Sequence, residues 1–140
     1  MSEKVFLDSN IVIDFLLDRS PFSESATRLF DLCVENKIQL FISAGSFDTL
    51  YYILRKNAIR HPDCIFLLKK LHKMVGTVEV DHRVVANSLE SEMGDLEDAI
   101  QYFCARKVKG IRAIVSRNFK GFNRGSIPIV TAEEYLKSLN

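Results

Sequence analysis

The chain has 140 residues, of which 47% are hydrophobic and 26% are charged, and its formal net charge is +1. This size and composition are typical of one folded protein with a real core, and we expect a single domain spanning residues 1–140. No apolar run is long enough to span a membrane, and the first residues do not resemble a signal peptide, so we expect a cytoplasmic protein. The three cysteines lack a metal-ligand spacing, which favours buried thiols over a zinc site.

Predicted strands alternate with predicted helices along the chain. Short apolar runs predict strands, and apolar residues three or four apart predict helices. We expect strands at 5–7, 38–42, 77–80, 113–115 and 127–130, and helices at 9–17, 23–35, 46–54, 61–75, 82–93, 96–108 and from 132 onward. The alternation predicts an α/β protein, a three-layer α/β/α sandwich around a parallel sheet of four to five strands.

A carboxylate directly follows the first predicted strand. Val5, Phe6 and Leu7 form a continuous apolar run, as a buried parallel strand does, and Asp8 comes next. Alpha/beta proteins place their chemistry at the carboxyl ends of strands, and we expect this first strand to be central. A buried acid must be satisfied by partners or be functional. Asp8 is therefore the leading candidate for a functional residue.

Other polar side chains are expected near the same edge of the sheet. Ser116 ends the fourth predicted strand, so it should lie on the same edge as Asp8. Asp95 and Asp98 are three residues apart, which places both on one face at the start of a helix. Asp48 lies in the third predicted helix.

Carboxylates that converge on one cleft repel each other and need a cation. Ligands that are all oxygen atoms select Mg²⁺ or Mn²⁺ over zinc. A bound divalent ion supports phosphodiester hydrolysis, and the basic stretches at 53–73 and 105–125, on either side of the acidic stretch 74–98, suit a polyanionic substrate. Each acid also has a simpler interpretation: Asp95 as a helix cap, Asp14 as a solvated residue at a helix end, and Asp48 as a surface acid.

The ordered set of motifs resembles the PIN-domain family. The motifs are FLDSNIVID at 6–14, ISA at 42–44, YYILRK at 51–56, DLEDAIQ at 95–101, IVSRN at 114–118 and IPIVT at 127–131. The resemblance implies a PIN-like fold and a Mg²⁺- or Mn²⁺-dependent endoribonuclease that cuts single-stranded RNA. It also implies a toxin of the VapC type with an antitoxin protein as partner, and a homodimer.

The resemblance implies site residues position by position. Asp8 and Asp98 match the family acids that bind metal and act in catalysis, and Asp95 matches a frequent further acid. Two positions depart from the family pattern. Thr49 stands where the third helix usually offers a glutamate, with Asp48 as a possible substitute metal ligand, and Gly121 replaces an acid after the fourth strand.

Two hypotheses follow. In the first, the enzyme uses Asp8, Asp98 and Asp95, and further residues position water, phosphate or the RNA backbone: Asn10, Ser116, Asn118, Arg117, Lys120 and Arg124. In the second, the chain is a degenerate PIN domain that binds RNA or a protein partner without cleaving, because the acids expected at Thr49 and Gly121 are missing.

Overall fold

The computed structural model describes residues 2–117 and 126–139, and five strands and seven helices are found in those residues. The strands are β1 (Glu3–Leu7), β2 (Ile38–Ser43), β3 (Gly76–Val78), β4 (Ile111–Val115) and β5 (Ile129–Val130). The helices are α1 (Ser9–Leu16), α2 (Ser23–Val34), α3 (Ala44–Lys56), α4 (His61–Met74), α5 (His82–Glu90), α6 (Leu96–Lys107) and α7 (Ala132–Ser138).

The strands form one parallel sheet in the order β3-β2-β1-β4-β5, which confirms the expected sheet and the central position of the first strand. Val5 on β1 lies opposite Leu40 on β2 and Ala113 on β4. Val5, Phe6 and Leu7 have no exposed surface, as expected for a strand covered on both faces. The carboxyl ends of β1 and β4 therefore lie side by side at the middle of one sheet edge.

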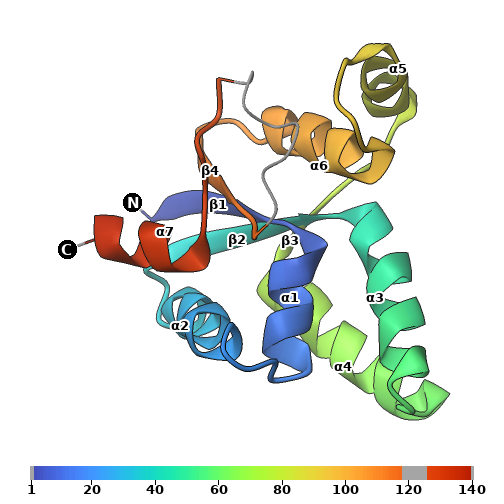
Figure 1. Ribbon diagram of the computed structural model, residues 1–140. Coiled ribbons are helices and arrows are strands. Elements are labelled where there is room, and N and C mark those ends of the chain that lie inside the picture. The colour runs from blue at the N-terminus through green and yellow to red at the C-terminus, as the bar shows by residue number, and fades with distance from the viewer. Residues whose placement is uncertain (1, 118–125, 140) are drawn as a thin grey trace.

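Helices cover both faces of the sheet, which confirms the three-layer sandwich (Figure 1). Helices α1, α2, α3, α4 and α7 share one apolar cluster with Val5 and Leu7 of β1. Helices α5 and α6 pack on the other face, where Phe6 and Ile114 point. The alternation of side chains along a strand explains why neighbouring residues of β1 enter different clusters.

Local sequence signals fix several element boundaries. The side chain of Asp81 caps α5 by accepting from the backbone N–H of Val84, and Thr131 forms a capping box with Glu134 at the start of α7. The prediction that the fifth helix reaches Met93 was wrong. The helix stops at Glu90 because Ser91 adopts an extended backbone, and the hydroxyl of Ser91 donates to the backbone carbonyl of Ser88 in the last turn.

The third strand ends at Val78 and not at residue 80 as predicted, because the neighbouring strand β2 ends at Ser43. Thr77 pairs with Ile42 and Val78 with Ser43, the last residue of β2, so residues beyond Val78 have no neighbouring strand. No helix among the described residues is long and apolar enough to cross a membrane. Cys64 and Cys104 are buried free thiols, as expected, and Cys33 is half-buried.

Candidate active site

Asp8 lies at the carboxyl end of β1 and is only 5% exposed. Its backbone N–H donates to the carbonyl of Val115 at the end of β4, and its own extended backbone begins α1. The hydroxyl of Ser116 donates to one carboxylate oxygen of Asp8 at 2.7 Å. The two strand ends that the sequence placed on one edge are thus in direct contact.

Gln101 holds the other oxygen of Asp8. The side-chain amide of Gln101 donates from Nε2 to Oδ1 of Asp8 at 3.1 Å, and its Oε1 accepts from the backbone N–H of Ser9 at 3.1 Å. Because a backbone N–H can only donate, the orientation of this amide is fixed. Gln101 is 3% exposed. The carboxylate of Asp8 is therefore clamped from both sides, with lone pairs left on each oxygen.

The role of Gln101 was not predicted from the sequence. The available signal was a polar residue among the apolar positions of α6, three residues after Asp98 and so on the same side of the helix. A second polar contact, 2.8 Å between the hydroxyls of Ser9 and Ser46, ties the start of α1 to α3. Each of these buried polar groups has a hydrogen-bond partner, which offsets the cost of removing it from water.

Asp98 stands in the first turn of α6, and its charge is coupled to that of Asp8. Partial burial, together with repulsion from Asp95, Asp8 and Glu97, raises the pKa of Asp98 from 3.8 to about 7, and burial is the largest cause. Asp95 is exposed, and its side chain caps α6 by accepting from the backbone N–H of Asp98 at 2.9 Å. The simpler interpretation of Asp95 as a helix cap is thus correct, and the cap is compatible with a further role.

Thr49, at the first departure from the family pattern, reaches a carboxylate on another helix. Its hydroxyl donates to Oε2 of Glu97 at 3.1 Å, which links α3 to the start of α6. Asp48, the possible substitute ligand, is exposed on α3. The structure thus places the carboxylate of Glu97, which the sequence reasoning left without a role, beside the position where an acid was expected.

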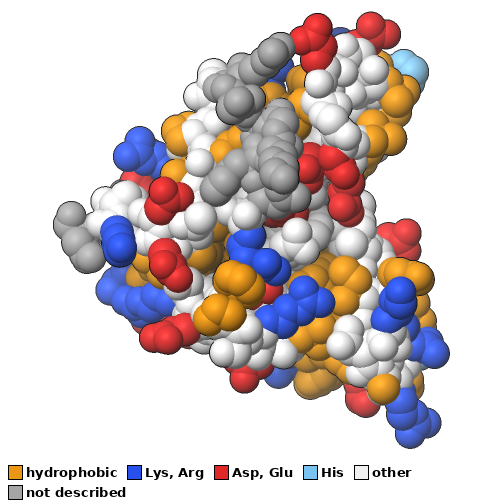
Figure 2. Space-filling model, in the orientation of Figure 1, with side chains coloured by type: hydrophobic (Ala, Val, Ile, Leu, Met, Phe, Trp, Pro, Cys, Tyr) orange, Lys and Arg blue, Asp and Glu red, His pale blue; other side chains and the backbone are white. Residues whose placement is uncertain are grey.

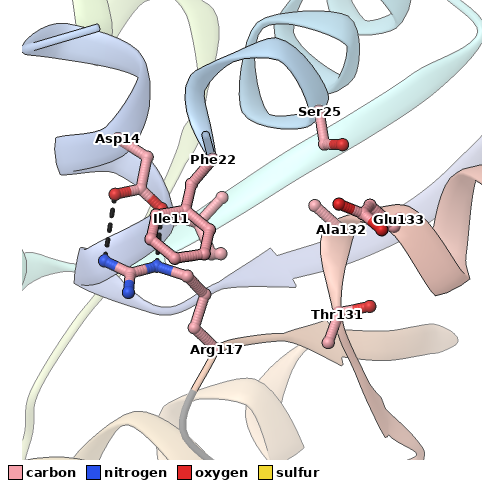
Figure 3. A pocket seen from close by; sticks show the side chains of 8 residues that line it. All are labelled: Ile11, Asp14, Phe22, Ser25, Arg117, Thr131, Ala132 and Glu133. Atoms are coloured by element: carbon pink, nitrogen blue, oxygen red, sulfur yellow. Dashed lines mark hydrogen bonds and ion pairs between the residues drawn. The ribbon is translucent and has the colours of Figure 1, made fainter. Parts of the chain in front are cut away.

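Asp14 is buried and forms an ion pair with the half-buried Arg117, so the interpretation of Asp14 as a solvated residue was wrong. Asp14 is 1% exposed, and Arg117 donates from Nε and one terminal nitrogen to its two oxygens at 2.8 and 3.0 Å (Figure 3). The guanidinium carbon of Arg117 also lies 4.0 Å from the centre of the Phe22 ring. Because α1 turns Asp14 toward the end of β4, the pair braces the strand end that carries Ser116.

Of the remaining residues that the sequence analysis singled out, only Asn10 lies within the described part of the chain. Asn10 is half-buried in the first turn of α1. Asn118, Lys120, Gly121 and Arg124 lie outside the described residues. Acidic side chains gather near the start of α6 in the region facing α3, and basic side chains lie below them over α1 and α3 (Figure 2).

The donor set fits a hard divalent cation. Asp8 and Asp98 offer only oxygen atoms. The pKa of Asp98 is raised by burial first and by repulsion from the neighbouring acids second, and a cation would relieve that repulsion. Within residues 2–117 and 126–139, no three His, Cys, Asp or Glu side chains are close enough to hold an ion together. Two carboxylates would leave most of the coordination positions of an ion to water, which Mg²⁺ tolerates.

Comparisons with known proteins identify a family and a relative for this chain. A model of the PIN domain matches residues 4–120. The chain is 29% identical over 144 residues to "Ribonuclease VapC1" of Aquifex aeolicus (strain VF5), covering 99% of this chain and 97% of the relative.

Two solved structures share the fold. A toxin-antitoxin complex from Klebsiella pneumoniae contains a chain with a TM-score of 0.66 and 20% identity, covering 91% of this chain and 97% of that chain. VapC20 of Mycobacterium tuberculosis, described as a toxin that cleaves the sarcin-ricin loop, gives a TM-score of 0.66 at 15% identity, covering 86% and 95%. The parallel five-stranded sheet and its flanking helices are thus those of an α/β protein of PIN type. The chain belongs to the PIN-domain family.

Proposed function

We propose that this protein is a Mg²⁺- or Mn²⁺-dependent endoribonuclease that acts as the toxin of a toxin–antitoxin pair. The observation that carries the proposal is the clamped carboxylate of Asp8, whose charge is coupled to that of Asp98 at the start of α6. The relative of 29% identity that is named a ribonuclease supports the same activity. Single-stranded RNA is the proposed substrate.

In this proposal each site residue has a separate task. Asp8 and Asp98 hold the ion, and Asp95 acts near them while it caps α6. The ion would supply Lewis-acid stabilisation of charge on the phosphoryl group and would activate water. Ser116 and Gln101 hold the carboxylate of Asp8 in place, so its geometry is set before substrate arrives.

The surface around the acids would hold the RNA backbone. Asn10 in the first turn of α1 is the proposed contact for water or phosphate. Ser116 was also predicted as such a contact, but it is buried and its hydroxyl proton is donated to Asp8, so its proposed role is to position that carboxylate. Asn118, Lys120 and Arg124 keep this role as predictions from the sequence. Arg117 also remains a candidate contact, although a phosphate would compete for its guanidinium with Asp14.

We further propose an antitoxin protein as the regulator, a homodimer as the assembly and the cytoplasm as the site of action. The antitoxin is supported by the similarity in fold to a chain from a toxin-antitoxin complex. Size-exclusion chromatography with light scattering measures the mass in solution, and a dimer predicts twice the chain mass of 16.0 kDa.

A second candidate function is binding without cleavage. It is favoured by Thr49, which offers a hydroxyl where an acid was expected, and by Asp48, which lies exposed beside it. A degenerate site of this kind would bind RNA or a protein partner with the same basic surface.

Cleavage of single-stranded RNA separates the two candidates. With Mg²⁺ or Mn²⁺ present, wild type is expected to cleave RNA, while Asp8→Asn and Asp98→Asn lose at least about 100-fold in rate, as expected for removal of a metal ligand. Asp31→Asn is the matched control, because Asp31 is an exposed acid on α2, away from the site. Equal amounts of intact RNA with wild type and the two site variants would reject the enzymatic function.

A further inference from the structure

A cavity of about 520 Å³ lies next to the acids, between the start of α3 and the start of α6. This size is within the usual range for small-ligand pockets. Gln101 lines the cavity and donates to Asp8, so one side chain separates the cavity from the clamped carboxylate. Ser46, which also lines it, bonds to Ser9, the residue after Asp8. Whatever occupies this α3–α6 pocket is therefore adjacent to whatever binds at Asp8.

One side of the α3–α6 pocket is apolar. Leu96 and Ile100 are four residues apart on α6, so they share one helix face, and Val80 from the segment after β3 completes this side. Leu96 is 51% exposed although it stands between Asp95 and Glu97. Leu96 therefore offers an exposed apolar surface to whatever occupies the pocket.

The other side offers hydrogen-bonding groups. The lining here includes Ser43 at the end of β2 and Ser46 and Thr49 on α3. The hydroxyls of Ser43 and Ser46 are buried and already bonded to the N–H of Gly45 and to Ser9, whereas Thr49 is half-buried. Glu97 reaches across the pocket from α6 to accept from Thr49 at 3.1 Å. Among the described residues Glu97 has no cationic partner, so its carboxylate can still accept hydrogen bonds from a ligand.

We propose that the α3–α6 pocket binds a nucleobase of the RNA strand next to the phosphate at Asp8, and that it selects bases with an exocyclic amino group. A base has an apolar face and a polar edge, which match the two sides of the pocket. The unpaired bases of single-stranded RNA can turn out of the strand into such a site. The carboxylate of Glu97 accepts from an amino group such as N4 of cytosine or N6 of adenine and repels the O4 carbonyl of uracil.

This inference rests on the proposed function, and its test is designed to separate the two. Binding of fluorescein-labelled oligo(A), oligo(C) and oligo(U) is measured by anisotropy on the Asp8→Asn protein with Mg²⁺, so the readout does not require cleavage. Cleavage of the same oligonucleotides by wild type is measured in parallel.

Oligo(A) and oligo(C) are expected to bind at least about tenfold more tightly than oligo(U). Leu96→Ala in the same background is expected to weaken binding of oligo(A) several-fold, and Glu97→Gln to remove most of the preference over oligo(U), because an amide offers both a donor and an acceptor. Leu89→Ala and Glu90→Gln are matched controls, since both residues are exposed on α5. Circular dichroism melts confirm that the variants fold.

Equal affinity for the three oligonucleotides, unchanged by Leu96→Ala and Glu97→Gln, would overturn the base pocket even if wild type cleaves RNA. Pocket-dependent preference without cleavage by wild type would keep the pocket and reject the nuclease. If the pocket binds a protein side chain and not a base, the three oligonucleotides should bind with equal affinity, and that result overturns the base pocket.

Discussion

Replacing Arg117 with methionine tests the ion pair that braces the strand end beside the site. The substitution leaves Asp14, which is 1% exposed, as a buried carboxylate without its partner. Losing one member of a buried pair costs about 3–5 kcal/mol in free energy of unfolding. With a urea slope of about 2 kcal/mol/M for a chain of this size, the unfolding midpoint should fall by roughly 1.5–2.5 M.

Two further variants sharpen this test. Arg112→Met is the matched control, because Arg112 is 63% exposed and contacts Glu3 at 3.6 Å, so its loss should cost about 0–1 kcal/mol. The double variant Asp14→Leu, Arg117→Met should recover most of the stability, since an apolar pair removes the stranded charge. Urea unfolding followed by circular dichroism measures all three. If Arg117→Met loses no more than Arg112→Met, the described pair does not brace the fold.

Two more predictions concern the acids and their clamp. Gln101→Leu should weaken binding of Mn²⁺, read by electron paramagnetic resonance, by about 10–100-fold, because it removes the donor to Asp8; unchanged affinity would contradict the positioning role. The carboxyl of Asp98 in the metal-free protein should titrate near pH 7 by carbon-13 NMR, and Asp8→Asn should lower that pKa by removing a like charge. Since the pKa of Asp98 is about 7 in the folded protein and its usual value is 3.8, the folded state holds an extra proton between these two values, so ionisation of this group lowers the stability as the pH rises from 3.8 to about 7.

The position of Asp8 and Ser116 on one edge of the sheet was predicted from the sequence, because parallel strands end on the same edge. Their contact depends in addition on β1 and β4 being neighbours, which the structure shows. The helix start at Asp95 and Asp98 was predictable because its capping signal is local.

The contacts of Gln101 and Arg117 could not be predicted in the same way. The partner of Gln101 depends on how α6 is rotated against the sheet, and the residues that meet are 93 positions apart. Asp14 and Arg117 are separated by 103 positions, and a bidentate contact needs the rotamers of both side chains. The sequence predicts which residues are polar, but packing between elements decides which of them pair.

The central claim is that Asp8 and Asp98 share one divalent cation, and anomalous diffraction from a crystal soaked in Mn²⁺ tests it most directly. We predict one anomalous peak within about 2–2.3 Å of an oxygen of each carboxylate. The peak should be missing from matched crystals of Asp8→Asn. A crystal without a peak between Asp8 and Asp98, or with manganese bound by neither, would contradict the claim and favour a domain that binds without cutting.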